Sequence, residues 1–184
     1  MPELVLLTHA TEFDRPSNTG RLVLQTAQAI AAGQTQADGV QWQVRAPLWQ
    51  RTQPDPVLLQ NLKVSAASQT QSYVLLYPAA DAIVVDVDKA DGDPAQTDAL
   101  PAGFILLDAT WQQAQKMYNQ SPYLHHLAKW QIKSAQPSVY QLRRNQKQQG
   151  WCTAELIQLL WQYTGACEAA AELAERFSGF NQRK

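Results

Sequence analysis

A carboxylate, a hydroxyl and an indole follow one another closely after an apolar run in the middle of the chain. The apolar residues 104–107 predict a buried strand, and residues 112–119 predict a helix, with a sharp turn between them. In open α/β sheets, ligands bind where a strand's carboxyl end meets a helix, and the free N–H groups of the helix can hold an anion. Asp108, Thr110 and Trp111 in this turn are therefore candidate functional residues.

A structural interpretation of the same turn stays open. Thr110 and Gln113 have the spacing of a capping box, so Thr110 can cap the helix while Trp111 packs and Asp108 closes the turn. This explains Asp108 less well, because a carboxylate at the end of a buried strand is costly unless it is solvated or paired.

A second polar cluster lies near the start of the chain, between residues 9 and 21. Arg15, Asn18, Thr19 and Arg21 carry side chains that can contact a phosphate or a base. The structural alternative is a solvated loop followed by a helix that Asn18 caps.

Two further clusters follow apolar segments. Residues 73–77 predict a buried strand, and the strand leads through Tyr77 and Pro78 to Asp81. The structural alternative there is a plain strand exit.

The fourth cluster begins after the predicted strand 139–142, where Arg143 and Arg144 form a basic pair. A helix start with Thr153 and Glu155 follows it. Arginines can hold a phosphate or a carboxylate in bidentate fashion, although basic residues also commonly occupy solvated loops.

Composition limits the classes of protein that fit. A length of 184 residues predicts one domain over 1–184, and a net charge of -1 excludes a strong basic field for nucleic acid. Cys152 and Cys167 form no CxxC pattern, which argues against a zinc site or a disulfide framework. The absence of a long apolar stretch and of a basic leader predicts no membrane span and a cytoplasmic location.

The order of predicted elements indicates the fold class. Apolar or alternating segments alternate with amphipathic ones, which predicts an α/β fold with a mostly parallel sheet flanked by helices. The predicted strands are 4–8, 40–44, 73–77, 83–85, 104–107, 129–133 and 139–142. The predicted helices are 21–32, 57–62, 112–119, 152–163 and 168–177, and a polar loop is expected over 9–20.

Taken together, the four clusters resemble the DTW-domain family of tRNA-uridine aminocarboxypropyltransferases. The matching blocks stand in the family's order and cover most of the chain. They are His9-x-x-Glu12-x-x-Arg15-Pro16-Ser17-Asn18-Thr19-Gly20-Arg21-Leu22, Leu76-Tyr77-Pro78-x-x-Asp81-Ala82, Leu107-Asp108-Ala109-Thr110-Trp111-x-x-Ala114-x-Lys116-Met117, and Tyr140-x-Leu142-Arg143 with Thr153-x-Glu155.

The resemblance implies a fold related to the SPOUT methyltransferases, with a trefoil knot near the cofactor site. It also implies S-adenosylmethionine as donor of a 3-amino-3-carboxypropyl group to N3 of a tRNA uridine, with methylthioadenosine leaving. Monomer and homodimer are both compatible with it. Two other functions stay open: an S-adenosylmethionine-dependent RNA methyltransferase of the SPOUT type, and a non-catalytic RNA-binding domain.

The resemblance also suggests roles for the candidate residues. Asp108 would be the base, with Thr110 and Trp111 as its catalytic neighbours; Thr110 would hold the donor's carboxylate and Trp111 would stack on a base. The cofactor site would comprise Tyr77, Pro78, Asp81, Asp108, Thr110, Trp111, Arg143, Thr153 and Glu155. The RNA contacts would comprise Arg15, Asn18, Thr19, Arg21 and Arg144.

The chain departs from the family pattern in two respects. Many members carry an amino-terminal cysteine cluster that this chain lacks, so no metal is expected. Cys152 stands where the family commonly has serine, and because cysteine is the poorer acceptor, Thr153 is expected to cap the following helix instead.

Overall fold

A computed structural model of the chain describes residues 1–34, 39–67, 72–89, 100–140 and 150–182. The chain forms two compact units. The first comprises Met1–Arg15, Gln43–Val84 and Leu100–Gln131, and the second comprises Pro16–Trp42, Val85–Ala99 and Ile132–Lys184. The expectation of one domain over 1–184 stays a prediction.

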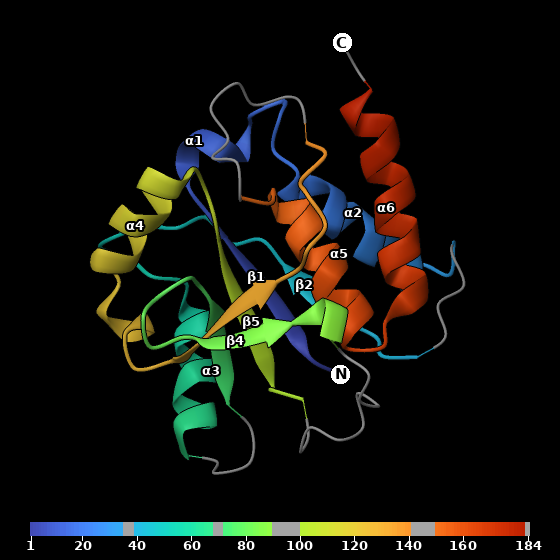
Figure 1. Cartoon of the computed structure of the whole chain (residues 1–184). Helices are drawn as coiled ribbons and strands as arrows, with labels where there is room; N and C mark the ends of the chain where they lie inside the picture. Colours follow the sequence, from blue (N-terminus) through green and yellow to red (C-terminus); the bar gives the residue numbers. More distant parts are fainter. Residues whose placement is uncertain (35–38, 68–71, 90–99, 141–149, 183–184) are drawn as a thin grey trace. The chain divides into compact units, whose positions relative to one another are not determined.

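A six-stranded sheet has the strand order β2-β1-β5-β3-β6-β4 (Figure 1). The pairs β2–β1, β1–β5, β5–β3 and β3–β6 are all parallel, which confirms the predicted α/β class and parallel sheet. The strands are β1 Glu3–Thr8, β2 Gln43–Arg45, β3 Tyr73–Leu76, β4 Ile83–Asp86, β5 Gly103–Asp108 and β6 Ala128–Lys133.

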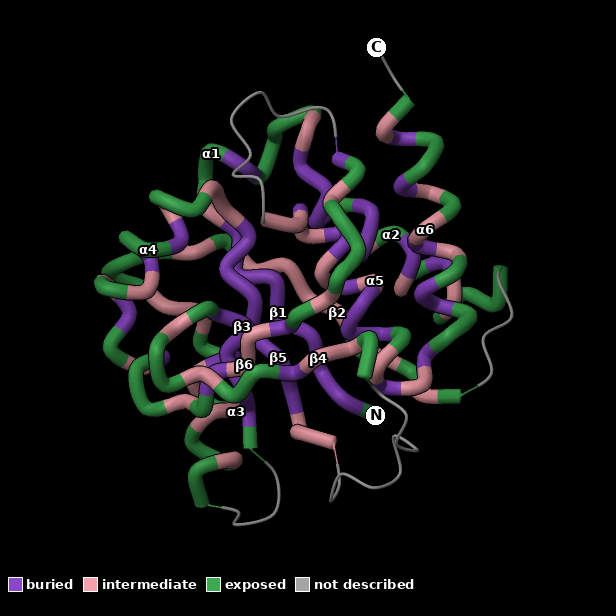
Figure 2. Tube along the Cα trace, in the orientation of Figure 1, coloured by how far each residue is buried: buried purple, intermediate pink, exposed green. Residues whose placement is uncertain are grey.

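The strands β1, β3 and β5 form the centre of the first unit because almost every side chain on them is apolar. Successive side chains of a strand point to opposite faces, and residues of both faces of these three strands are buried (Figure 2). One face carries a core cluster to which α3 (Pro56–Ala67) contributes Leu58 and α4 (Trp111–Asn119) contributes Ala114 and Met117. Both helices therefore pack on the same face of the sheet.

Three helices pack against one another in the second unit: α2 (Gly20–Ala31), α5 (Thr153–Tyr163) and α6 (Cys167–Asn181). The fully buried Trp161 of α5 lies 6.4 Å from Trp42, measured between ring centroids. Gly33 follows α2 with a φ of 68°, the left-handed conformation that ends a helix, as its position after the apolar pattern predicts.

Four elements differ from the sequence-based expectation. The helix expected over 57–62 is α3, which begins at Pro56 and continues to Ala67. The loop expected over 9–20 contains a short helix, α1 (Ala10–Phe13), because the His9 side chain caps it. The strand expected over 40–44 is β2, which lies later in the chain, at Gln43–Arg45. The strand expected over 139–142 is wrong for residues 139 and 140, which have no regular structure, and its other two residues lie outside the described residues.

The remaining described elements are short, namely the 3-10 helices η1 (Val87–Lys89) and η3 (Pro122–Leu124). Among the described residues, no helix has the length and apolar character needed to cross a bilayer. The trefoil knot and the relation to SPOUT methyltransferases stay predictions.

Candidate functional site

Asp108 is the last residue of β5 and is only 4% exposed. The parallel register places it beside Thr8, the last residue of β1, and the Thr8 hydroxyl lies 3.3 Å from Asp108 Oδ2. The same hydroxyl lies 3.1 Å from the carbonyl of Leu6, and the backbone N–H of His9 donates to the Asp108 carbonyl at 3.1 Å. A buried carboxylate thus stands at the carboxyl end of two neighbouring central strands, which is the ligand edge of a parallel sheet.

Thr110 begins α4 as its N-cap, as the sequence predicts. Gln113 N–H approaches Thr110 Oγ1 at 3.4 Å, and Gln113 Oε1 accepts from the Thr110 backbone N–H at 3.0 Å, which completes the capping box. The Thr110 hydroxyl donates to Gln113 Oε1 at 2.7 Å, so toward a ligand it can act only as an acceptor. The N–H groups of Trp111 and Gln112 have no partner within the helix and can hold an anion.

Gln113 also links α4 to the segment that follows β1. Its Nε2 donates to Thr11 Oγ1 at 2.7 Å, and that hydroxyl lies 2.9 Å from His9 Nδ1. Because the Thr11 backbone N–H donates to the same Nδ1 at 3.2 Å, a neutral His9 carries its proton on Nε2. The His9 ring stacks on Trp49 with centroids 5.9 Å apart. This network holds the turn between β5 and α4 against the exit of β1.

An aromatic row extends from Trp111 across α4. Its ring, 43% exposed, stacks on Tyr77 at 5.6 Å between centroids, and Tyr77 stacks on Tyr118 at 4.8 Å. The Tyr118 ring lies 4.7 Å from that of His125. Burial raises the pKa of the Tyr77 phenol, with the neighbouring Tyr118 acting in the same direction. The structure therefore brings together two predicted site residues, Trp111 and Tyr77.

Asp81 pairs with a lysine that sequence reasoning missed. Lys129 Nζ of β6 lies 2.7 Å from Asp81 Oδ2, in the segment that follows Pro78. The Lys129 side chain is 8% exposed and the Asp81 side chain is 70% exposed. Their mutual hydrogen bond is the main reason why the pKa of Asp81 is lowered and the pKa of Lys129 is raised.

The predicted cofactor residue Glu155 lies in the second unit, where its carboxylate binds the chain's own groups. It accepts from the Ser138 hydroxyl at 3.0 and 2.8 Å, from Val139 N–H at 2.7 Å and from Cys152 N–H at 2.8 Å. The expectation that Thr153 caps α5 is wrong, because Cys152 is the N-cap and shares a capping box with Glu155. The Glu155 carboxylate accepts from the N–H of Cys152, which is the reciprocal half of the capping box. The cofactor roles of Thr153 and Glu155 stay predictions.

Asn18 and Thr19, both expected to meet RNA, are each only 3% exposed. Asn18 Oδ1 accepts from the N–H of Gly20, the first residue of α2, at 2.6 Å, but the N-cap of this helix is Thr19 and not Asn18 as expected. Thr19 Oγ1 accepts from Ala154 N–H at 3.2 Å and so joins the starts of α2 and α5. These bonds give both residues a structural task, and their contact with RNA stays a prediction.

The predicted RNA-binding arginines Arg15 and Arg21 have different hydrogen-bonding partners. Arg15 pairs with the fully buried Glu12 at 2.5 Å, and Arg21 donates to the Pro16 carbonyl at 3.2 Å. Arg144, also expected to meet RNA, and Arg143, expected to bind the cofactor, fall within 141–149, outside the described residues, so their roles stay predictions.

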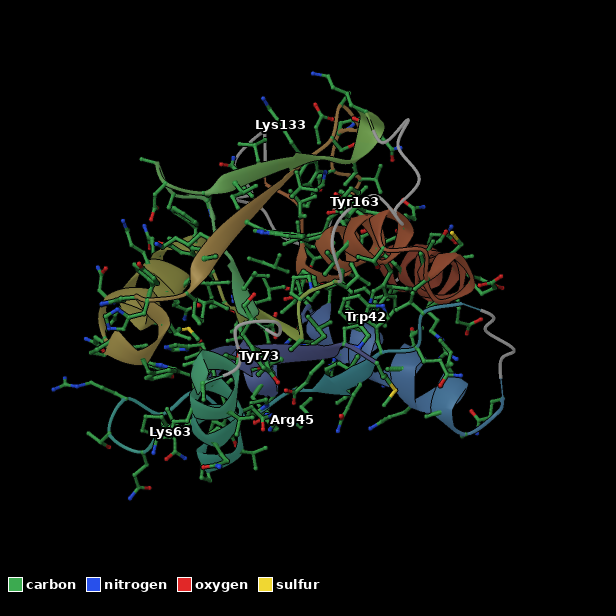
Figure 3. The ribbon with its side chains drawn as sticks, turned by 90° about the horizontal axis from the view of Figure 1, so that it is seen from below. Trp42, Arg45, Lys63, Tyr73, Lys133 and Tyr163 are labelled. Atoms are coloured by element: carbon green, nitrogen blue, oxygen red, sulfur yellow. The ribbon has the colours of Figure 1, made fainter. Side chains whose placement is uncertain are left out.

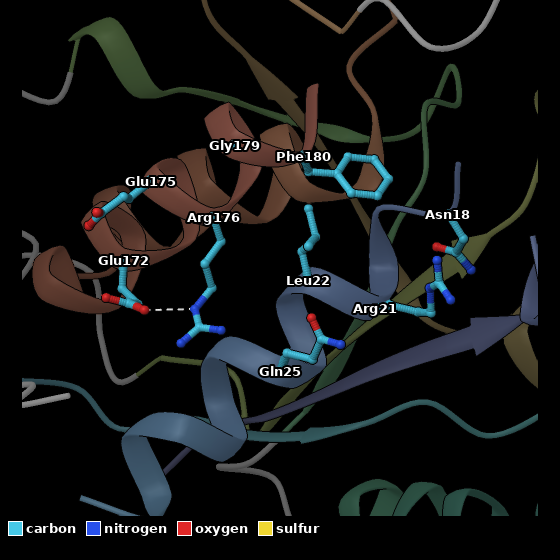
Figure 4. Close-up of a pocket in the computed structure, with 9 residues that line it drawn as sticks. All are labelled: Asn18, Arg21, Leu22, Gln25, Glu172, Glu175, Arg176, Gly179 and Phe180. Atoms are coloured by element: carbon cyan, nitrogen blue, oxygen red, sulfur yellow. Dashed lines mark hydrogen bonds and ion pairs between the residues drawn. The ribbon is translucent and has the colours of Figure 1, made fainter. Parts of the chain in front are cut away.

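Within the second unit, α2 and α6 border a groove of about 690 Å³ (Figure 4). Arg21 lines it, but so do acidic side chains, and Arg176 already pairs with Glu172 at 2.6 Å. The mixed charge gives a phosphate little net attraction. The lining residues are Asn18, Arg21, Leu22, Gln25, Glu172, Glu175, Arg176, Gly179 and Phe180, and none belongs to the 108–111 turn.

Some site residues could have been recognised from their spacing in the sequence, and others could not. Trp111 and Tyr118 stand seven positions apart, the spacing of residues on one helix face, so Tyr118 could have been found. Lys129 and Thr8 had no such signal, because only strand pairing places them beside Asp81 and Asp108.

Comparison with known proteins agrees with the residue pattern. The model of a family described as the DTW domain matches residues 2–184, nearly the whole chain. No solved structure matches the chain. The chain therefore belongs to the DTW-domain family, the family of tRNA-uridine aminocarboxypropyltransferases.

Proposed function

We propose that this chain transfers the 3-amino-3-carboxypropyl group of S-adenosylmethionine to N3 of a tRNA uridine and releases methylthioadenosine. The observation that carries the proposal is the buried Asp108 carboxylate beside a helix start and the half-exposed Trp111 ring, in a member of a tRNA-modifying family. All three groups of the 108–111 turn belong to the first unit.

The groups around this turn suit the parts of the donor. The exposed Trp111 ring offers a stacking face to adenine or to uracil, and stacking on an aromatic side chain contributes about 1–3 kcal/mol per base. Because the Thr110 hydroxyl proton is engaged by Gln113, Thr110 offers a ligand only an acceptor and does not suit the donor's carboxylate. Tyr77 and Pro78 would line the same pocket.

The proposed task of Asp108 is to remove a proton. Uridine N3 is a poor nucleophile until its weakly acidic proton is lost, and a positioned carboxylate can accept that proton. The proton then stays on the Asp108 carboxyl group until water takes it up. When bound, the donor supplies an electrophilic carbon beside its sulfonium sulfur, so that the N3–C bond forms as the C–S bond breaks and sulfur keeps the electron pair. The site must present this carbon, and not the methyl group, to N3.

The tRNA would be held by Arg15 and Arg21, with Asn18 and Thr19 shaping the segment between them and Arg144 adding a further contact. With a net charge of -1, the affinity for tRNA must depend on few phosphate contacts. Added salt should therefore weaken binding less steeply than it does for a strongly basic protein.

The test is incubation of the protein with S-adenosylmethionine and tRNA from cells that lack this protein, followed by mass spectrometry of the digested nucleosides. The proposal predicts an aminocarboxypropyl-uridine and an equal amount of methylthioadenosine. A methylated nucleoside with S-adenosylhomocysteine would instead show a methyltransferase. If S-adenosylmethionine does not bind at all while tRNA does, the chain is an RNA-binding domain.

A further inference from the structure

Lys129 has a largely buried side chain and an exposed counter-ion. Its side chain is 8% exposed, whereas that of Asp81, 2.7 Å from Nζ, is 70% exposed. An ion pair in contact with water contributes little stability. Stability therefore gives little physical reason for a lysine at this position of β6.

The surroundings of the pair connect it to the 108–111 turn. In the β3–β6 register Lys129 stands opposite Leu75, a member of the core cluster, so its side chain rises from the face that α4 covers. Its Nζ lies 6.0 Å from the centre of the Tyr118 ring. Tyr118 stacks on Tyr77, and Tyr77 stacks on Trp111. The ion pair thus stands at one end of the aromatic row and the turn at the other, within one unit.

We propose that the Asp81–Lys129 pair binds the α-amino-acid head group of the donor, with Lys129 Nζ holding its carboxylate and the Asp81 carboxylate holding its ammonium. A zwitterion carries the two charges that match this pair. Its entry replaces one ion pair by two without changing the net charge of the site. Because Asp81 is exposed, it can move to admit the ligand while the buried Lys129 stays fixed. This inference rests on the proposed function, since the head group belongs to the proposed donor.

The test compares two thioether ligands, one with and one without the amino-acid arm. S-adenosylhomocysteine has the amino-acid head group and methylthioadenosine lacks it, and neither carries the sulfonium charge. Their dissociation constants are measured by calorimetry on the full chain. The wild-type protein should bind S-adenosylhomocysteine more tightly than methylthioadenosine.

Substitutions then show which residues cause the tighter binding of S-adenosylhomocysteine. Lys129→Met should weaken binding of S-adenosylhomocysteine by about tenfold or more, the scale of a lost charge-assisted hydrogen bond, and leave methylthioadenosine unaffected. Asp81→Asn should also reduce the preference for S-adenosylhomocysteine over methylthioadenosine. Because the Asp81 side chain is exposed, this substitution should leave the fold unchanged. Lys133→Met, at the exposed end of the same strand, is the matched control and should bind both ligands as the wild type does.

The outcomes separate this inference from the proposed function. If the wild type binds neither ligand, the proposed function fails and the inference fails with it. If the wild type prefers S-adenosylhomocysteine but Lys129→Met and Asp81→Asn keep that preference, only the assignment to this ion pair is overturned. If Lys129→Met does not fold, Asp81→Asn alone decides, because loss of the preference supports the assignment and its retention overturns it.

Discussion

At the scale of single residues, the side chains of the 108–111 turn differ in what the chain leaves them able to do. The Thr110 hydroxyl proton is directed to Gln113 Oε1 at 2.7 Å, so Thr110 cannot donate to a substrate. Asp108 accepts from the Thr8 hydroxyl at 3.3 Å, a long distance for this kind of hydrogen bond. Because a carboxylate can accept a proton and the Thr110 hydroxyl is engaged, the proposed function gives the removal of the N3 proton to Asp108.

Asp108→Asn should lower the rate of aminocarboxypropyl transfer by about 10²–10⁴-fold, the usual contribution of a general base. The asparagine keeps the size of the side chain and one acceptor oxygen for Thr8. The rate is measured by nucleoside mass spectrometry at several times, with the melting temperature recorded for each protein. Asp14→Asn, at an exposed position after α1, should keep the wild-type rate. A fully active Asp108→Asn protein would exclude Asp108 as the base.

Cys152 should be unreactive although it lies at a helix start, where a thiol pKa is ordinarily lowered. Burial raises the pKa of this thiol to about 12, and the charge of Glu155 acts in the same direction. Since only the thiolate is alkylated, iodoacetamide at about pH 8 should modify the exposed Cys167 and spare Cys152. Peptide mass spectrometry measures both sites, and both should react in denaturant. Equal labelling of the two cysteines in the native protein would contradict the buried position of Cys152.

At the scale of elements, the pairing of β5 with β3 depends on a close approach at the start of both strands. The register sets Gly103 opposite Tyr73, and a Cβ atom on Gly103 would lie 2.2 Å from Cε1 of the Tyr73 ring. The Tyr73 hydroxyl donates to the Glu3 carboxylate, which holds the ring over Gly103. Glycine is required at this position by the space that Tyr73 fills.

Gly103→Ala should lower the free energy of unfolding by about 1–3 kcal/mol, the usual cost of overpacking a core. Urea denaturation measures the change. Gly179→Ala is the control, because a Cβ there meets nothing within 4 Å and alanine is the better helix former. It should raise stability by about 0.5–1 kcal/mol. If both variants were as stable as the wild type, the packing of Tyr73 on Gly103 would be wrong.

At the scale of the whole molecule, a buried polar network stands at the end of the strands opposite to Asp108. Glu3, 6% exposed, accepts from Arg45 Nε at 2.6 Å, from Asn61 Nδ2 at 3.0 Å and from the Tyr73 hydroxyl. Arg45 and Tyr73 are labelled in Figure 3. Arg45 also pairs with Asp55 at 3.2 Å. Burial by itself raises the pKa of the Glu3 carboxyl, but these hydrogen bonds and the Arg45 charge outweigh it and lower the pKa below 4.5. The network therefore makes stability depend on pH.

The sign of that dependence follows from the lowered pKa. A carboxyl group that is more acidic in the folded state stabilises the protein above its unfolded pKa, and this contribution is lost as pH falls through the folded value. The free energy of unfolding should therefore fall as the solution is acidified below about pH 4.5, the ordinary glutamate value. Glu3→Gln should be less stable at neutral pH and lose less on acidification. Urea titrations at several pH values measure both slopes, and parallel slopes would contradict the role of Glu3.

Local residue patterns were sufficient to predict much of the fold and part of the candidate site. The apolar runs of β1, β3 and β5, the end of α2 before Gly33 and the capping box of Thr110 depend on residues close together in the sequence. The order of four residue blocks was sufficient to indicate the DTW-domain family. The segment 139–142 was misjudged because its side-chain pattern suits a strand but residues 139 and 140 have no regular structure.

By itself, then, the sequence determined the element types, the parallel sheet and the position of Asp108 between a strand and a helix. Only the tertiary structure decided which strands are neighbours, and hence that Thr8 lies beside Asp108, that Lys129 pairs with Asp81 and that Tyr77 stacks between Trp111 and Tyr118. The physical reason is that helix caps and strand alternation are short-range effects. Strand order instead depends on contacts between distant segments, which form where burial of both faces of the sheet is most favourable.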